Sequence, residues 1–241
     1  MFHALEYGPM HAYATPNAVR ERVMRLQGKP HTTEIIDAAR AALVVIDMQN
    51  HFVAPGFPGE APVARDIVPN INRVAAAMRA AGGKVIWIQT TATGATERWP
   101  THHRHKLSPA SAARRLASLA QEGEGFKLYP QLEALPVDLR VTKIKYSAMI
   151  PGSSNLGEVL AQHGLDTLLI AGTKTNACCE TTARDASMLN HRVTMLSDCN
   201  AAWNDEEHAG ALNNFLLFFG DVLTADEALA RLAPAAAQKS A

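Results

Sequence analysis

Three residue types that suit acyl-transfer chemistry occur where apolar runs end in this chain. Asp47 directly follows one short apolar run, Lys143 lies in another, and Cys178 follows a third by one turn. A thiol is a weak nucleophile and its thiolate a strong one, so a nucleophilic cysteine needs a group that takes its proton. Asp47 can take that proton, and the Lys143 ammonium can keep the carboxylate ionised. The three side chains together indicate nucleophilic attack on a carbonyl carbon, with an aspartate where histidine is usual.

Cys178 lies in a glycine-initiated turn, 172–179, that runs straight into a predicted helix. Because a helix N-terminus favours negative charge, we expect its dipole to lower the pKa of the Cys178 thiol. The same turn is expected to present backbone N–H groups to a developing oxyanion. Cys179 is the next helical residue and points elsewhere, so we interpret it, like Cys199, as a structural core residue.

Alternating strands and helices are predicted to position these residues. Short β-rich apolar runs, typical of strands buried on both faces of a parallel sheet, occur at 43–46, 85–88, 141–144, 167–171 and 192–196. Helical patterns occur at 16–26, 67–82, 109–120, 156–163, 177–190 and 204–220, the last with Asn204 as its cap. The alternation predicts an α/β fold, a three-layer αβα Rossmann-like domain in which ligands bind beyond the carboxyl ends of the strands.

Composition limits the classes of partner. The 241 residues include 23 Lys and Arg and 23 Asp and Glu, so the formal net charge is zero, and we expect neither nucleic acid nor membrane as a partner. No apolar stretch approaches 18 residues, no secretory signal is evident and three cysteines form no disulfide framework, so a cytoplasmic protein is predicted. The expected organisation is an N-terminal arm at 1–40, one domain at 41–232 and a disordered tail at 233–241.

Three segments resemble the signature blocks of the isochorismatase-like cysteine hydrolases. They are ALVVIDMQNHF at 42–52, KIKYSAM at 143–149 and GTKTNACCETTARDA at 172–186, in the order in which the family has them. Three matched blocks are far more specific than one short motif. The resemblance spans roughly 42–223. It implies a six-stranded, mainly parallel sheet and a homo-oligomer, either a dimer or a tetramer.

The resemblance also implies roles for single residues. Asp47 matches the general base, Lys143 the catalytic lysine and Cys178 the nucleophile. The backbone N–H groups of Lys174 and Cys178 match the family's oxyanion hole. The Thr173–Lys174 peptide bond matches a cis non-proline bond of the family, a strained and usually functional feature.

Three positions depart from the family's pattern. Lys174 stands where small or apolar residues are common, Cys179 where valine is usual and Met149 where phenylalanine is usual. We expect the Lys174 side chain to reach either the pocket or a subunit contact, and Met149 to alter the shape of the pocket. Cys179 leaves the register of the nucleophile intact.

Within the superfamily, the blocks look most similar to those of the ureidoacrylate and N-carbamoyl amidohydrolases. Nicotinamidases carry a metal-binding Asp-x-His element after the second strand, and QTTA at 89–92 lacks it, so no metal is predicted. We therefore predict a cofactor-free cysteine amidohydrolase that cleaves a C–N bond of a small ureido, N-carbamoyl or carboxamide substrate. A thioester intermediate forms, and ammonia or an amine is released. Two alternatives stay open: a vinyl-ether hydrolase of the isochorismatase type, which does not need Cys178, and a non-catalytic oligomeric binding module.

Loop residues near the predicted edge of the sheet are candidates for binding a small-molecule substrate. They are Asn50, Phe52, Trp99, His103, Lys145 and Tyr146. The Asn50 amide could orient a ureido group, and Lys145 could bind a carboxylate or face solvent. The spacing of His102, His103 and His105 fits no zinc pattern, so we interpret this cluster as a polar loop at the mouth of the pocket.

Overall fold

A parallel sheet lies at the centre of the computed structural model, which describes residues 11–233. Six strands pair in the order β4-β3-β2-β5-β6-β7, and every pair is parallel. Their bounds are β2 (Ala41–Ile46), β3 (Lys84–Thr90), β4 (Leu139–Lys143), β5 (Thr167–Thr173), β6 (Arg192–Ala201) and β7 (Asp221–Leu223). The strand order reverses between β2 and β5, which is where doubly wound sheets open a crevice for ligands.

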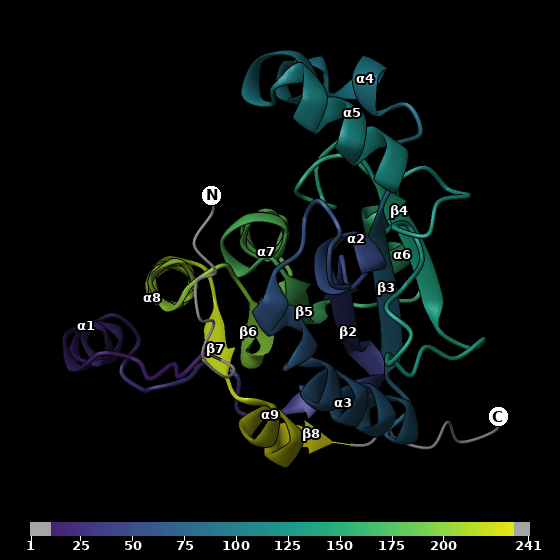
Figure 1. Ribbon diagram of the computed structural model, residues 1–241. Coiled ribbons are helices and arrows are strands. Elements are labelled where there is room, and N and C mark those ends of the chain that lie inside the picture. The colour runs from purple at the N-terminus through teal and green to yellow at the C-terminus, as the bar shows by residue number, and fades with distance from the viewer. Residues whose placement is uncertain (1–10, 234–241) are drawn as a thin grey trace, which may run out of the picture.

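Both faces of this sheet are covered by helices. Leu43 and Val45 of β2 pack into the core on one face, and Val44 and Ile46 pack into the core on the other, so the strand is apolar throughout. Helices α3 (Val68–Ala80) and α9 (Ala225–Arg231) cover the first face, and α6 (Leu156–Gln162), α7 (Glu180–Met188) and α8 (Asp205–Phe218) cover the second (Figure 1). The predicted three-layer α/β fold with a six-stranded parallel sheet is confirmed.

The cap predicted for α8 is present, but α8 is not the last helix. The Asn204 side chain accepts a hydrogen bond from the Glu207 backbone N–H at 2.8 Å. After α8 come the three-residue strand β7 and α9, which opens with a capping box between Thr224 and Glu227. A run as short as β7 carries too few residues for a periodic signal, so the sequence analysis identifies neither β7 nor the seven-residue α9.

The N-terminal segment packs against its own chain. Helix α1 (Asn17–Gln27) contacts α8, and the Tyr13 hydroxyl donates to the Asn213 side chain at 2.9 Å. The Thr32 hydroxyl donates to Asp221 of β7, also at 2.9 Å. Strand β1 (Ile36–Asp37) and the short helix η1 (Ala38–Arg40) then lead into β2.

A second, two-stranded sheet joins the segment before β2 to the C-terminal end of the described chain. Strand β1 pairs in parallel with β8 (Leu232–Ala233). Ala233, the first residue of the expected tail, is thus part of this sheet, and residues 234–241 of that tail lie outside the described residues. Within 11–233, no helix combines the length and apolarity that crossing a bilayer requires.

Short helices build a cap where the sequence shows no periodicity. The polar segment 91–107 contains α4 (Ala95–Arg98) and the π-helical turn η3 (His102–Lys106), and α5 (Pro109–Ser118) follows. The Ser108 hydroxyl caps α5 by accepting from the Ser111 N–H at 3.2 Å. These elements lie beyond the carboxyl ends of the strands (Figure 1). Helix α2 (Asn50–Val53) lies between them and β2, and η2 (Pro62–Arg65) leads into α3.

Candidate active site

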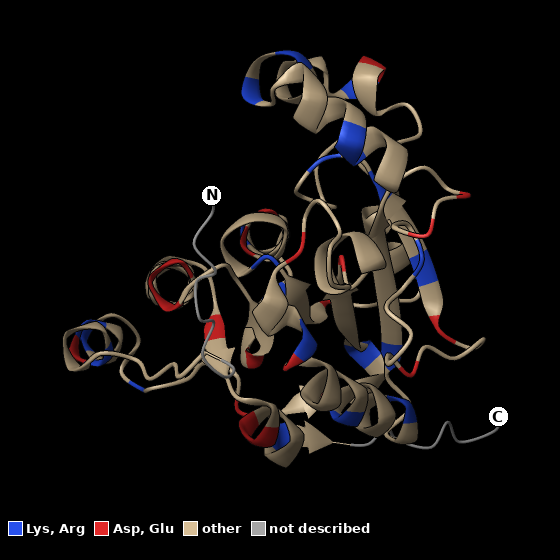
Figure 2. Ribbon diagram, viewed as in Figure 1, with Lys and Arg blue, Asp and Glu red and all other residues tan. Residues whose placement is uncertain are grey.

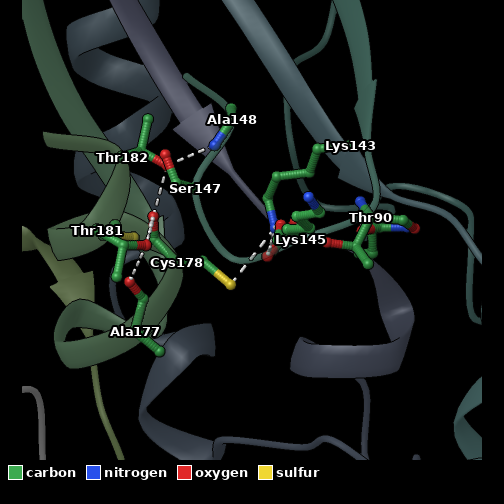
Figure 3. A network of polar contacts seen from close by, with 12 residues as sticks. Thr90, Lys143, Lys145, Ser147, Ala148, Ala177, Cys178, Thr181 and Thr182 are labelled. Carbon is green, nitrogen blue, oxygen red and sulfur yellow. Dashed lines mark hydrogen bonds and ion pairs between the residues drawn. The ribbon is translucent and has the colours of Figure 1, made fainter. Parts of the chain in front are cut away.

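Asp47, Lys143 and Cys178 meet at the carboxyl edge of the sheet. The Lys143 ammonium Nζ lies 2.8 Å from Asp47 Oδ2 and 3.4 Å from Cys178 Sγ. Figure 3 shows the Cys178 sulfur directed at this ammonium. Asp47 and Lys143 are fully buried, and Cys178 is 5% exposed, so only a small group entering from the rim reaches the sulfur. The three side chains that the sequence singles out therefore form one cluster.

The backbone around β2 and β5 brings the carboxylate and the thiol together. Asp47 directly follows β2 and lies in the left-handed region, with φ 55°, a sparsely populated conformation for a non-glycine residue. Its N–H donates to the Ile88 carbonyl of β3 at 2.9 Å. Gly172 of β5 has φ 119°, and a Cβ there would lie 2.0 Å from the Ile46 carbonyl oxygen. Only glycine permits β5 to approach β2 this closely and to lead directly into the turn that carries Cys178.

Thr90 completes the polar centre, although the sequence analysis gives it no role. The Lys143 ammonium donates to Thr90 Oγ1 at 2.7 Å, and Thr90 Oγ1 donates to Asp47 Oδ1 at 2.8 Å. Lys143 also donates to the Lys145 carbonyl at 3.2 Å. Each Asp47 oxygen thus accepts a hydrogen bond from a different donor, which fixes the plane of the carboxylate. The sequence does carry one signal for Thr90. It lies at the end of the strand that follows Asp47 along the chain, where side chains are expected near the carboxyl edge of the sheet.

Gln49 holds the end of β3 in register with this centre. Its side-chain oxygen accepts from the Thr90 N–H at 2.7 Å, and its side-chain nitrogen donates to the Thr90 carbonyl at 3.0 Å. The same nitrogen donates to the Phe126 carbonyl at 2.9 Å. The buried Gln49 amide thus pairs with the backbone of Thr90 as a neighbouring strand would. The position of Gln49 in the sequence, two residues after Asp47, does not reveal this role.

Opposing effects act on the Lys143 ammonium. Burial lowers the pKa of Lys143, whereas the negative charges of Asp47 and Cys178 and the hydrogen bond to Asp47 raise it, and the net direction is upward. Lys143 therefore stays charged at neutral pH. It can hold a negative charge on the neighbouring oxygen or sulfur, but it is not the group that removes a proton.

The expectation of a lowered pKa for Cys178 is wrong. Burial, followed by the charge of Asp47, raises the pKa of the Cys178 thiol to about 12, and the charge of Lys143 lowers it less. A hydrogen bond with Asp47 also raises it. The helix dipole contributes less than one pKa unit at a surface site, whereas full burial shifts a pKa by several units, so burial dominates. The resting sulfur is a thiol, which makes a neighbouring base necessary.

The other two cysteines lie outside this centre. Cys179 is fully buried, and its Sγ contacts the Ala171 carbonyl of β5 at 3.9 Å. Cys199 is buried on the opposite face of the sheet, beside Asp198. All three cysteines are free thiols, and only Cys178 contacts the Lys143 ammonium.

The turn before Cys178 places a second cation at the rim. The Thr173–Lys174 peptide bond is cis, and η4 (Thr175–Cys179) follows it. Lys174 Nζ lies 4.4 Å from the centroid of the Trp203 ring. Burial lowers the pKa of Lys174 to about 8, against the charges of Cys178 and Glu207, which raise it.

An aromatic cluster joins the cap to the segment after β4. The Trp99 ring stacks on His102 with centroids 4.0 Å apart, and Tyr146 meets the Trp99 ring edge-on at 4.8 Å. His103 Nδ1 lies 3.1 Å from the Trp99 carbonyl. Burial and then the charge of Cys178 raise the pKa of Tyr146, which places its phenol within electrostatic reach of the nucleophile. Trp99, His103 and Tyr146 thus gather on one side of the site, while His105 is exposed.

The remaining substrate-binding candidates are placed differently. The Asn50 amide donates to the Glu124 carbonyl at 2.9 Å, so it holds a loop in place rather than pointing a free group at the sulfur. Phe52 is buried, with the Arg115 guanidinium 5.8 Å from its ring centroid. Lys145 contributes its carbonyl to Lys143, and its own side chain is half-exposed.

No metal centre is evident in the part of the chain that the structure describes. Among residues 11–233, no three His, Cys, Asp or Glu side chains converge in a way that could hold a metal ion. His102 and His103 instead contact the Trp99 ring and the Trp99 carbonyl. The reactive groups available at this site are a carboxylate, an ammonium, a thiol and backbone N–H groups, which together suit acyl transfer through a covalent intermediate.

Comparisons with known proteins find related sequences. The isochorismatase domain model matches residues 41–227. A ureidoacrylate amidohydrolase RutB from Variovorax paradoxus (strain S110) is 30% identical, over 95% of this chain and 94% of its own length.

Solved structures match as well. A cysteine hydrolase from Pseudomonas syringae pv. phaseolicola 1448A has a TM-score of 0.71 at 28% identity, over 85% of this chain and 98% of that chain. N-carbamoylsarcosine amidase from Thermoplasma acidophilum shares the fold, with a TM-score of 0.59 at 22% identity over 78% and 97% of the two chains. Because the domain model covers more than half of its residues, this chain belongs to the isochorismatase family of hydrolases.

Proposed function

We propose that this protein is a cysteine amidohydrolase that cleaves the C–N bond of a small ureido, N-carbamoyl or carboxamide substrate. The observation that carries the proposal is the contact of one buried ammonium, Lys143 Nζ, with both the Asp47 carboxylate and the Cys178 thiol. The relatives named as ureidoacrylate amidohydrolases support a C–N bond as the target. A binding module has no use for a buried base beside a thiol.

The first half of the reaction forms a covalent intermediate. Asp47 accepts the proton of the Cys178 thiol while the sulfur attacks the substrate carbonyl carbon, so a C–S bond forms and the carbonyl oxygen becomes an oxyanion. The backbone N–H groups of Lys174 and Cys178 are our candidates for holding this oxyanion. Asp47 then returns the proton to the substrate nitrogen, the C–N bond breaks, and ammonia or an amine leaves.

The second half restores the enzyme. Water attacks the carbonyl carbon of the thioester, which is a thiocarbamate when a ureido carbonyl has reacted. Asp47 takes a proton from this water, the C–S bond breaks, and the proton passes to the sulfur to regenerate the thiol. Lys143 stays charged throughout and, through its ion pair with Asp47, holds the carboxylate in place for both proton transfers.

The experiment measures ammonia release from a panel of ureido acids, N-carbamoyl compounds and simple carboxamides. Cys178→Ala is expected to reduce release to background, and Cys179→Val, one residue away, to retain most of it. Mass spectrometry of quenched wild-type enzyme should find the acyl adduct on the peptide that contains Cys178.

Two outcomes would contradict the proposal. An inactive Cys179→Val with an active Cys178→Ala would show that the nucleophile is misassigned. Turnover of a vinyl ether that survives Cys178→Ala, with no C–N cleavage in the wild type, would favour the isochorismatase reaction.

A further inference from the structure

Arg115 is a cation of the cap that faces the catalytic centre. It lies on α5, three residues before Ser118, so the two side chains share one face of the helix. Ser118 Oγ lies 2.9 Å from His51 Nδ1 of α2, which fixes that face of α5 against α2. The Arg115 guanidinium lies 5.8 Å from the centroid of the Phe52 ring, also on α2. Figure 2 shows the basic part of α5 on the side of the molecule where the strands end.

The neighbours of Arg115 are next to the catalytic residues in the chain. Arg115 packs with Thr91, His103 and Ile144 around a small space that has no room for a water molecule. Thr91 follows Thr90, Ile144 follows Lys143, and the Thr91 N–H donates to the Lys143 carbonyl at 2.9 Å. This small space therefore lies at the ends of β3 and β4, the strands that carry Thr90 and Lys143.

Electrostatic effects agree with this placement. After burial and the charges of Asp47 and Lys143, the positive charge of Arg115 is a further cause that acts on the pKa of Cys178, which it lowers. The same charge lowers the pKa of Tyr146, against burial and the charge of Cys178, which raise it. The positive charge of Arg115 thus acts on both the thiol and the phenol.

This charge has no acidic partner among residues 11–233. No carboxylate in the described residues 11–233 forms an ion pair with Arg115, although other arginines pair with acids. Lys143 is balanced by Asp47, and Lys174 lies on the Trp203 ring with Glu207 acting on it. A half-buried guanidinium without an acid is costly, and its planar fork matches a carboxylate in a bidentate pair.

We propose that Arg115 binds the carboxylate of the substrate and thereby selects anionic ureido or N-carbamoyl acids over neutral amides. The substrate class rests on the proposed function, whereas the anion-binding role of Arg115 rests on its position. The substrate would lie with its carboxylate under α5 and its carbonyl carbon at Cys178. Lys145, for which the sequence leaves open a carboxylate-binding and a solvent-facing role, is the competing residue.

The test separates binding from turnover. Calorimetry with the Cys178→Ala protein measures the dissociation constants of N-carbamoylglycine, an anion, and of its neutral methyl ester. We expect Arg115→Gln to weaken binding of the acid by about 10- to 100-fold, as the loss of a charge-assisted pair does, and binding of the ester by less than about 3-fold. Arg115→Lys keeps the positive charge but loses the planar guanidinium. Its affinity for the acid should therefore lie between those of the Arg115 protein and of Arg115→Gln.

Arg114→Gln is the matched control. Arg114 is the exposed neighbour on the same helix, and its guanidinium reaches only Ser111, so its loss should leave both affinities unchanged. In otherwise wild-type enzyme, Arg115→Gln should raise KM for the acid with little change in KM for the ester.

Each result decides the proposal. A loss of acid binding without a matching loss of ester binding supports the carboxylate-binding role of Arg115. If the wild type nevertheless cleaves neither probe, only the proposed function is refuted. If Arg115→Gln weakens binding of the acid and the ester equally, or weakens neither, Arg115 does not bind the carboxylate. Turnover by the wild type would then still support the proposed function. If Lys145→Gln selectively weakens binding of the acid and Arg115→Gln does not, the carboxylate is bound by Lys145 and the proposed role of Arg115 is wrong.

Discussion

Replacing Lys143 with methionine tests whether the ammonium holds the catalytic centre together. Its Nζ lies 2.8 Å from Asp47 Oδ2, and both side chains are fully buried. At an effective dielectric constant of 20, two unit charges at that distance attract by about 6 kcal/mol, and desolvation offsets much of this. Removing one partner leaves a buried carboxylate without compensation, which costs about 3–5 kcal/mol.

Urea unfolding at neutral pH, followed by tryptophan fluorescence and circular dichroism, measures this cost. With a slope of about 3 kcal/mol per molar, Lys143→Met should lower the midpoint by about 1–2 M. Turnover should fall by at least about 10²-fold, because Asp47 is then no longer held as a base. Lys145→Met is the control, since the Lys145 side chain is half-exposed and only its carbonyl contacts Lys143; its midpoint should stay within about 0.2 M of the wild type.

A double variant distinguishes the ion pair from simple packing. In Asp47→Asn, Lys143→Met both charges are absent, so we expect it to recover more than half of the stability that Lys143→Met loses, without recovering turnover. A Lys143→Met midpoint equal to that of the wild type would refute the reasoning. A double variant no more stable than the single variant would show that the methionine fails by packing rather than by leaving a charge unpaired.

Three further outcomes follow from the structure. Gly172→Ala should abolish stable folding or lower the unfolding free energy by more than about 4 kcal/mol, because its Cβ would lie 2.0 Å from a β2 carbonyl oxygen. Gly157→Ala is the control and should be tolerated, since the space around Gly157 is open. Urea unfolding midpoints compare the two variants. Burial lowers the pKa of His208 to about 3 from an ordinary value of 6.5, so the unfolded chain binds more protons between these values and stability falls as the pH is lowered through that window. Between pH 7 and 5.5 this residue accounts for a loss of about 1.3 kcal/mol. The difference in unfolding free energy between these two pH values should shrink by that amount in His208→Asn but not in the exposed control His105→Asn. Thr90→Val removes the hydroxyl that bridges the Asp47 carboxylate and the Lys143 ammonium, so kcat should fall about 10-fold. Thr90→Ser keeps a hydroxyl and should restore kcat. An unchanged kcat in Thr90→Val would show that this bridge plays no part in the reaction.

The sequence predicts the fold and the central cluster for one physical reason. Strands buried on both faces are short, continuous apolar runs, and the carboxyl ends of parallel strands meet at one edge. Residues that directly follow such runs, as Asp47 does, are therefore predictable neighbours across more than a hundred residues of chain. Cys178 follows its strand by only one turn, so the same reasoning places it.

Residues outside this rule were not predictable from spacing. Arg115 reaches the site from α5 because the hydrogen bond between Ser118 and His51 docks that helix on α2, a contact between segments 67 residues apart. The aromatic contacts of Trp99 come from short helices whose polar sequence has no period. Local patterns specify that a helix forms, whereas the helix that it docks on depends on packing with distant segments.

The thiol pKa of Cys178 changes how the proposed chemistry must work. A sulfur with a pKa near 12 is almost entirely protonated at neutral pH, and thiols in that state resist oxidation and alkylation. The nucleophile is therefore generated only when a carbonyl carbon is in place, so that loss of the proton to Asp47 and formation of the C–S bond occur together. In that step the negative charge of Asp47 is neutralised, and the new charge appears on the substrate oxygen. Lys143, 3.4 Å from the sulfur, remains beside the reacting atoms as the fixed positive charge, which explains why a buried cation with a raised pKa suits this site better than a second base.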